Sequence, residues 1–331
     1  MANGFRFTGP ACCCCTRLYV GLRTNAANDM RRHDTAGSSP GSPSPAFSTY
    51  GRSLDFDPVH KRVFVTRGIV PTDNNSVFRY DEEFGNQLLL TTLGSDRPDC
   101  ITSDSDNELA YFTSIDTPTT TTTLHVVAHD GTGYAAIGAL TNTGGQTRNP
   151  IHYCRANGKL YYCSTSTGGQ RLYRVDTDGT NDTLIATSAT LNGQLRDVTV
   201  DNDNSLIYWV DNATVNGATS RLYRSDLDGA GVTLLLTGAA LDSLNGPNEV
   251  FYGPQWSHSK QRLYYWMQDS FIPSAANDAT HGLFSMQSDG SDIQFHISRG
   301  NGTDWWSFGT ETPFDWRIAC GFETLGAGST A

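Results

Sequence analysis

The stretch from Leu206 to Leu236, LIYWVDNATVNGATSRLYRSDLDGAGVTLLL, decides the fold. It combines an aromatic strand pattern at Tyr208 and Trp209, a polar loop, a second strand pattern at 221–224 and an Asp-Gly turn at 228–229. Similar aromatic strands begin near residues 64, 111, 161, 208 and 264. Short strands that recur about every 45 to 55 residues are typical of a β-propeller, with one blade per repeat. The sequence therefore predicts an all-β fold.

The two ends of the chain carry strand patterns outside the five repeats. Residues 17–22, RLYVGL, match the second strand of a repeat, and the tail after residue 303 matches only first strands, with Trp305, Trp306 and Trp316. We expect both ends to pair in one blade, because this closes the ring and removes exposed sheet edges. The prediction is a six-bladed β-propeller over residues 50–331. Residues 1–49 are an N-terminal segment that supplies the strand near 17–22 and continues as a Ser/Pro/Gly-rich loop.

Composition limits the possible partners. The net charge of -11 and the pI near 5.0 disfavour nucleic acid and anionic membranes as general ligands. No apolar run reaches the length of about 18 residues that a membrane span needs, so no membrane insertion is expected. The N-terminal MANGFRFTGPACCCC lacks the apolar core of a signal peptide. Few lysines and long polar loops nevertheless suit an exterior. We therefore hypothesise a component of a virus particle or of another extracellular assembly.

Cysteines and acidic turns give no firm cofactor signal. The run Cys12, Cys13, Cys14 and Cys15 fits either buried thiols or metal ligands that need a turn or symmetry mates. A tight hairpin at 157–158 would place Cys154 opposite Tyr161 rather than opposite Cys163, so no disulfide is expected there. The acidic turns, such as 176–182 and 226–229, lack EF-hand spacing and are interpreted as hairpin turns. No cofactor and no metal site are predicted.

An arginine precedes each of the first four aromatic strands by 12 to 14 residues, and an aspartate follows within three residues in three of these cases. The first strand of a propeller blade lines the central channel. Two interpretations stay open for this series, namely an interblade Arg–Asp network and a site for a carboxylate or phosphate group. The candidate ligand-binding residues at the channel mouth are Arg52, Arg97, Arg148, Arg196, Asp55, Asp99 and Asp197.

The fourth repeat resembles a known family. Asp201, the tetrad 208–211 (YWVD), the strand 221–224 (RLYR) and the Asp-Gly turn resemble the YWTD repeat of low-density lipoprotein receptors and related extracellular proteins. The resemblance implies a six-bladed propeller that binds partners rather than catalyses a reaction. The family's cysteine-rich flanking modules have no counterpart here, so receptor biology is not expected to carry over.

Catalytic motifs do not appear. The sequence has no Gly-x-Ser-x-Gly, no His-Glu-x-x-His and no phosphate loop, and its eight histidines are scattered. We therefore expect a non-enzymatic recognition or structural module with a protein or glycan partner. The alternative is a metal-dependent hydrolase similar to the propeller lactonases, with Asp55, Asp99, Asp197 and Glu249 as channel-mouth carboxylates.

Overall fold

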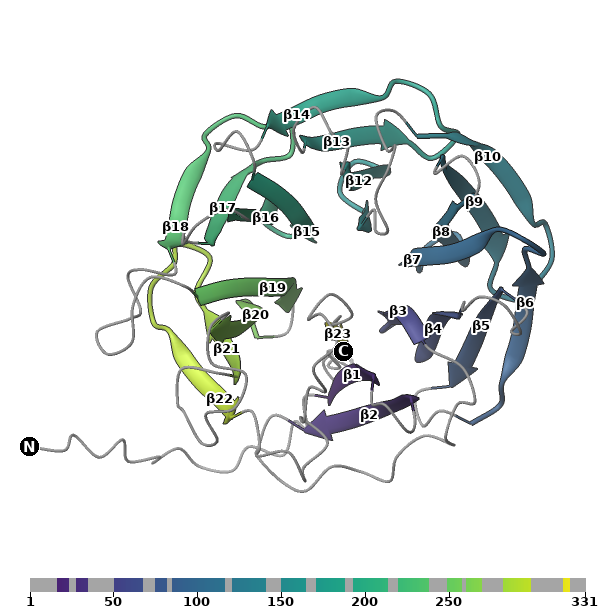
Figure 1. Ribbon diagram of the computed structural model, residues 1–331, viewed down its shortest axis with the longest axis horizontal. Helices are drawn as coiled ribbons and strands as arrows, with labels where there is room; N and C mark the ends of the chain where they lie inside the picture. The colour runs from purple at the N-terminus through teal and green to yellow at the C-terminus, as the bar shows by residue number, and fades with distance from the viewer. Residues whose placement is uncertain are drawn as a thin grey trace, which may run out of the picture.

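The computed structural model contains five four-stranded antiparallel sheets arranged as blades around a central axis (Figure 1). It describes residues 17–23, 28–34, 51–67, 75–81, 85–116, 121–140, 150–164, 171–187, 193–213, 220–237, 249–257, 260–269, 282–298 and 318–321. In this part of the chain no helix has the length and apolar character needed to cross a membrane. The predicted all-β propeller is confirmed.

Each blade is one sequence repeat. Blade 1 contains β3 (Gly51–Asp57), β4 (Arg62–Arg67), β5 (Ser76–Asp81) and β6 (Leu88–Thr92), and blade 2 contains β7 (Arg97–Asp104), β8 (Leu109–Ile115), β9 (Thr122–Ala128) and β10 (Ala135–Ala139). Blade 3 contains β11 (Ile151–Cys154), β12 (Lys159–Ser164), β13 (Arg171–Asp176) and β14 (Thr183–Thr187). Blade 4 contains β15 (Gly193–Asp201), β16 (Leu206–Ala213), β17 (Arg221–Asp226) and β18 (Thr233–Thr237). Blade 5 contains β19 (Glu249–Ser257), β20 (Arg262–Asp269), β21 (Gly282–Met286) and β22 (Gln294–Ser298).

A three-stranded sheet contains strands from both ends of the chain. β1 (Arg17–Arg23) pairs antiparallel with β2 (Asn28–Asp34) on one side and with β23 (Ile318–Gly321) on the other. The sequence predicts β1 but assigns β2 to a loop, because residues 25–49 are polar and then rich in Ser, Pro and Gly. An edge strand needs only one hydrogen-bonding neighbour, and charged residues are common there. The described chain thus has five complete blades rather than the six expected, together with this sheet.

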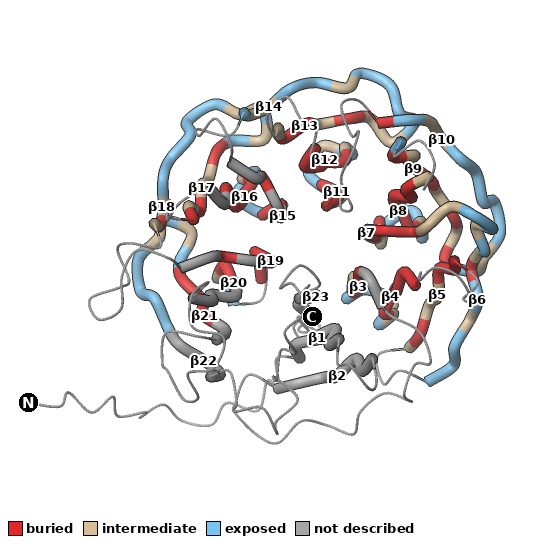
Figure 2. The backbone as a smooth tube through the Cα atoms, in the orientation of Figure 1, coloured by how far each residue is buried: buried red, intermediate tan, exposed pale blue. Residues whose placement is uncertain are grey.

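The core lies between neighbouring blades. Tyr208 of blade 4 stacks on Trp256 of blade 5 with ring centroids 5.5 Å apart, and both residues belong to one buried cluster that spans the two blades. Burial falls from the axis outward, and the rim strands β6, β10, β14 and β18 are largely exposed (Figure 2). The aromatic strands are therefore sandwiched between sheets, which explains why the repeat is conspicuous in the sequence.

The Asp-Gly turns also hold blades together. Gly229 has a φ of +85°, and an added Cβ would lie 2.7 Å from the carbonyl oxygen of Ile185, on the outer strand of the preceding blade. Such a φ favours glycine, and the close approach excludes any side chain. The interpretation of these acidic segments as turns with positive φ is confirmed, since Gly131, Gly179 and Gly290 have φ values of +87°, +83° and +87°.

Candidate functional site

The predicted channel-mouth residues lie on the innermost strands. Arg52 and Asp55 are on β3, Arg97 and Asp99 are on β7, and Arg196 and Asp197 are on β15. Arg148 lies outside the described residues, and the side chains of Arg52, Arg196 and Glu249 do as well. The strands that carry these residues surround the central axis (Figure 1).

β-Bulges interrupt the inner strands at these residues. The register of β3 against β4 skips Arg52, and the register of β15 against β16 skips Arg196. In β7 the skipped residues are Asp99 and Cys100, whereas Arg97 keeps regular pairing with β8. A bulge bends the strand and changes the direction of its side chains. Arg52 and Arg196 are therefore equivalent positions, and Arg97 is not equivalent to them despite its similar offset in the sequence.

Asp55 connects blade 1 to blade 2. Its Oδ2 atom accepts hydrogen bonds from the backbone N–H of Ser103 at 2.6 Å and from the Ser103 hydroxyl at 2.8 Å. Burial raises the pKa of Asp55 to about 6, and the bonds from Ser103 oppose this rise. Asp55 pairs with the aromatic residue of the second strand in blade 1. Thr102 and Thr199 occupy the equivalent positions in blades 2 and 4. Their Oγ1 atoms accept backbone N–H groups of the next blade at 3.0 and 3.2 Å, so Asp55 makes a bond that threonine makes elsewhere.

Asp197 and Asp99 also contact their neighbours. Asp197 Oδ2 accepts the backbone N–H of Gly253, in blade 5, at 3.1 Å. Asp99 is 1% exposed, and the Cys100 thiol donates to its Oδ2 at 3.5 Å. The backbone carbonyl of Asp99 accepts the Thr66 hydroxyl at 2.6 Å. Asp55 and Asp197 thus stabilise blade packing, while Asp99 is buried within the scaffold.

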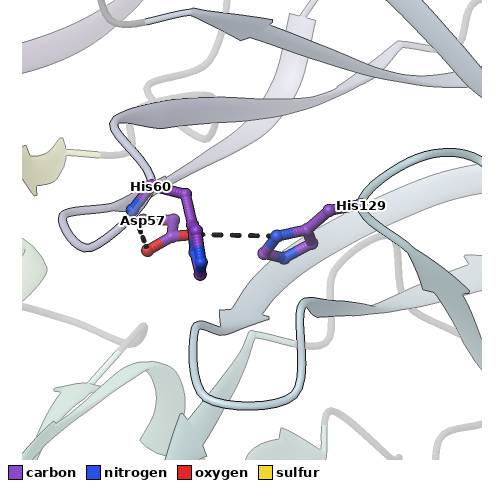
Figure 3. A group of neighbouring side chains, drawn as sticks. All are labelled: Asp57, His60 and His129. Carbon is purple, nitrogen blue, oxygen red and sulfur yellow. Dashed lines mark hydrogen bonds and ion pairs between the residues drawn. The ribbon is translucent and has the colours of Figure 1, made fainter.

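A second group of ionisable side chains lies where blades 1 and 2 meet (Figure 3). Asp57 ends β3, His60 lies in the β3–β4 turn, and His129 lies in the β9–β10 turn. His60 Nδ1 lies 2.7 Å from Asp57 Oδ2, and His129 Nδ1 lies 3.6 Å from the same oxygen. The ligand atoms of the three residues all lie within 4.8 Å of one another. Among the residues that the structure describes, this is the one such group of His, Cys, Asp or Glu that could hold a metal ion.

The surroundings of Asp57 are polar on the turn side. Asp57 Oδ1 accepts the backbone N–H groups of Val59 and His60 at 2.9 and 3.2 Å and the Ser105 hydroxyl at 2.6 Å. Glu108 lies at the outer side of the group, with Oε1 3.9 Å from His60 Nε2. The hydrogen bond from Arg62 to Glu108, 2.9 Å long, is the main reason that the pKa of this exposed carboxyl is lowered.

Sequence reasoning treated these histidines as scattered, because 69 positions separate His60 from His129 in the chain. One signal was available in the turn itself. Asp104 and Asp201 occupy the position of Asp57 in blades 2 and 4, and each is followed three residues later by asparagine where blade 1 has His60. A histidine that replaces a recurrent turn residue is a local departure from the repeat.

Comparison with known proteins supports the fold and goes no further. No protein-family model matches the chain, and no curated protein matches it. A solved nidogen/laminin complex contains a chain that superposes with a TM-score of 0.62 at 16% identity, and the match covers 92% of this chain and 99% of that one. TolB from Acinetobacter baumannii gives 0.62 at 15% identity, covering 84% of this chain and 62% of that one. An oligogalacturonate lyase in complex with manganese gives 0.56 at 11% identity, covering 82% and 71%. The expected resemblance to YWTD propellers therefore holds for the propeller fold.

Proposed function

We propose that this propeller is a non-enzymatic recognition or structural module whose partner is a protein or a glycan. The observation that carries the proposal is the use of the channel-mouth carboxylates within the scaffold. Asp55 and Asp197 accept backbone N–H groups from neighbouring blades, and Asp99 is buried. These bonds give the Asp55 and Asp197 carboxylates a structural role between blades that needs no bound ion or substrate. The likeness to a chain from the nidogen/laminin complex adds support for a protein partner.

The same observation weighs against the hydrolase alternative. A metal-dependent hydrolase of the lactonase kind would need several of Asp55, Asp99, Asp197 and Glu249 to point at one cation. The bonds of Asp55 and Asp197 instead run to different blades. The fold likeness to an oligogalacturonate lyase, at 11% identity, carries no catalytic residue over to this chain.

Six-bladed closure belongs to the same proposal. β1 pairs with β23 over four residues, from Arg17 opposite Gly321 to Val20 opposite Ile318. We propose that the sheet β2-β1-β23 is the sixth blade and that it closes the ring between blades 5 and 1. A closed ring would give a rigid platform for binding, because no sheet edge is left to pair with other chains. Its use on a virus particle or on another extracellular assembly stays a hypothesis from composition.

Parallel binding and turnover assays test the proposed function. Purified protein is titrated with a sulfated polysaccharide and with an acidic peptide, and the same preparation is incubated with lactones and polygalacturonate in the presence of Ca²⁺ or Mn²⁺. We expect saturable, salt-sensitive binding to at least one probe and no turnover. Turnover that requires the cation and is lost in Asp197→Asn would overturn the proposal. Exposed Asp203→Asn is the control for the loss of one carboxylate, because Asp203 lies in the β15–β16 turn.

A further inference from the structure

The blade 1–blade 2 boundary carries two histidines at turn positions where the other blades have different residues. In the β3–β4 turn, His60 Nδ1 contacts Asp57 Oδ2 at 2.7 Å. In the equivalent turns of blades 2 and 4, the side-chain amides of Asn107 and Asn204 donate to the aspartate Oδ2 at the same distance of 2.7 Å. Asparagine therefore makes the same hydrogen bond within the turn. The turn geometry alone does not explain why blade 1 has a histidine at position 60.

His129 is also exceptional among its equivalents. The residue before the Asp-Gly turn is Thr177 in blade 3, Leu227 in blade 4 and Ser288 in blade 5. What the position supplies to the fold is its backbone carbonyl, which accepts an arginine of the preceding blade. Arg79 Nη1 donates to the His129 carbonyl at 2.6 Å, just as Arg224 Nη1 donates to Ser288 at 2.7 Å. The imidazole of His129 is thus an addition to a position that folds with three other side chains.

The tautomer of His129 leaves a lone pair that faces Asp57. Nε2 lies 3.1 Å from the carbonyl oxygen of Leu109, which can only accept, so Nε2 carries the proton. A neutral ring that carries its proton on Nε2 leaves the Nδ1 lone pair free. Nδ1 is buried and has no hydrogen-bond partner, and it lies 3.6 Å from Asp57 Oδ2, an acceptor too. Both residues have fully buried side chains.

Two acceptors that face each other in a buried site call for a cation between them. A histidine whose second ring nitrogen donates to a backbone carbonyl is the usual arrangement for a metal ligand, because this bond orients the ring. Two imidazole nitrogens and one carboxylate oxygen suit a first-row transition metal, whereas Ca²⁺ and Mg²⁺ prefer oxygen ligands alone. Around tetrahedral zinc with bonds of about 2.0 to 2.2 Å, ligand atoms lie roughly 3.3 to 3.6 Å apart. The 3.6 Å separation between His129 Nδ1 and Asp57 Oδ2 fits this geometry, whereas the 2.7 Å contact of His60 Nδ1 with Asp57 Oδ2 must lengthen when His60 binds the ion.

We propose that Asp57, His60 and His129 bind a divalent transition-metal ion of the zinc class, which clips the first hairpin of blade 1 to the outer turn of blade 2. The metal takes Asp57 Oδ2, His129 Nδ1 and His60 Nδ1, and solvent fills the fourth position on the half-exposed side of His60. Binding removes the proton from His60 Nδ1, and the ring then carries its proton on Nε2. That nitrogen lies 3.9 Å from Glu108 Oε1, too far for a hydrogen bond but near enough for the carboxylate to favour a proton on Nε2.

Titration of metal-free protein with Zn²⁺ and Co²⁺ tests this site. The repeat itself supplies matched variants: His60→Asn copies the turns of blades 2 and 4, and His129→Thr copies blade 3. Each removes one ligand, while the turn amide and the carbonyl that Arg79 needs are kept. We expect the parent protein to bind one ion per chain, with a melting temperature that rises with Zn²⁺ concentration. Each variant should weaken binding by at least about 100-fold and leave the metal-free melting temperature within a few degrees of the parent value.

The cysteines require a control, since Cys12, Cys13, Cys14 and Cys15 can also bind zinc. The titrations are therefore run in a background with these four cysteines changed to serine, and Asn107→His serves as the control for an added imidazole. A Co²⁺ spectrum with ligand-field bands and no thiolate charge-transfer band supports the proposal, even if a variant fails to fold. A thiolate band, equal zinc affinity in the parent protein and both variants, or no zinc binding by the parent protein would overturn it.

Discussion

Arg224 in β17 donates a hydrogen bond from Nη1 to the backbone carbonyl of Ser288, 2.7 Å away in the β21–β22 turn of the next blade. Arg79 and Arg174 make the same contact to the turns of blades 2 and 4, at 2.6 and 3.3 Å. Blade 2 has Val126 at this register position. The arginine is therefore a clamp between blades that the repeat uses three times.

Loss of one clamp is predicted to lower stability. Arg224→Val replaces the arginine with the residue that blade 2 uses, so the strand propensity is kept and the bond is lost. A hydrogen bond from a charged donor contributes about 1.5 to 3 kcal/mol, and we expect a loss of this size in the free energy of unfolding by urea. Arg155→Val is the control, because the Arg155 side chain is 62% exposed and its ion pair should contribute less than about 1 kcal/mol. Equal losses in the two variants would remove the clamp interpretation.

The glycine of the Asp-Gly turn gives a second prediction with an internal control. Gly229 and Gly94 both have positive φ, at +85° and +64°, but an added Cβ meets backbone only at Gly229. Gly94→Ala should therefore cost about 1 to 2 kcal/mol, the left-handed penalty alone. Gly229→Ala should cost about 1 to 3 kcal/mol more, because the outer strand of blade 3 must move. Denaturant midpoints of the two variants measure the difference. A smaller effect at Gly229 than at Gly94 would contradict this packing argument.

The repeat can be recognised in the sequence because every propeller blade buries its second strand, which is therefore rich in aromatic residues. Tyr161 and Tyr208 are completely buried, and their aromatic strands stand out against polar loops. Local turn geometry was less accessible. A tight turn at 157–158 predicts Cys154 opposite Tyr161, but the turn takes residues 155–158, and Cys154 pairs with Lys159. Cys154 and Cys163 are both free and buried. Two-residue and four-residue hairpins have similar sequence signals, so the register was wrong by two positions.

The candidate metal group could not be predicted in the same way. His60 and His129 meet because the first hairpin of blade 1 faces the outer turn of blade 2, and no sequence periodicity encodes that contact. The arginine series shows the opposite limit. The regular distance of these arginines from the aromatic strands is evident in the sequence. The β-bulges that leave Arg52 and Arg196 unpaired in the strand register are not. The bulges in this protein have no distinctive residue composition. Equivalent residues on the inner strands of different blades can therefore be identified only from the strand pairing in the structure.

A buried histidine makes a prediction about pH. His125 is 3% exposed, stacks on Phe112 with centroids 4.9 Å apart, and contacts Ser114 Oγ and the Tyr134 hydroxyl through its two nitrogens. Burial lowers its pKa to about 4. The unfolded chain therefore takes up a proton on this residue near pH 6.5, before the folded chain does. The stability that His125 contributes is complete above about pH 6.5 and is lost as the pH falls toward about 4.

Comparison of the parent protein with His125→Gln measures this contribution. The difference between their free energies of unfolding should change by about 3 kcal/mol from pH 7 to pH 4, with the parent losing more. Glutamine keeps a donor and an acceptor near Ser114 and Tyr134, and it does not titrate. Parallel pH profiles for the two proteins would show that His125 is not the titrating group.

Ring closure is tested by two deletions that differ only in β1. Removal of residues 1–16 leaves β1 (Arg17–Arg23) intact, whereas removal of residues 1–24 takes away the strand between β2 and β23. If the sheet is the sixth blade, the longer deletion exposes edges of the ring and should give aggregated protein, because unpaired edge strands recruit other chains. The shorter deletion should stay monomeric. Light scattering and melting temperature are the measurements, and a soluble 1–24 deletion with an unchanged melting temperature would exclude closure by these strands.

The last prediction concerns Arg52 and Arg196, the two bulge residues. We expect them to bind an anionic group of the partner, because bulges direct side chains out of the regular ladder and guanidinium groups bind carboxylate or sulfate through paired hydrogen bonds. Arg52→Gln and Arg196→Gln should each weaken binding of the sulfated polysaccharide about tenfold or more. Raised salt should weaken binding by the parent protein in the same direction.

Stability separates this role from a scaffold role for the same arginines. Arg155→Gln removes the same charge from an exposed turn, so it measures the general electrostatic effect on binding. A double variant of Arg52 and Arg196 that unfolds at the parent temperature and has lost binding supports recognition. A double variant destabilised by roughly 3 to 5 kcal/mol, the range for a buried charge left without its partner, would place both arginines in an interblade network.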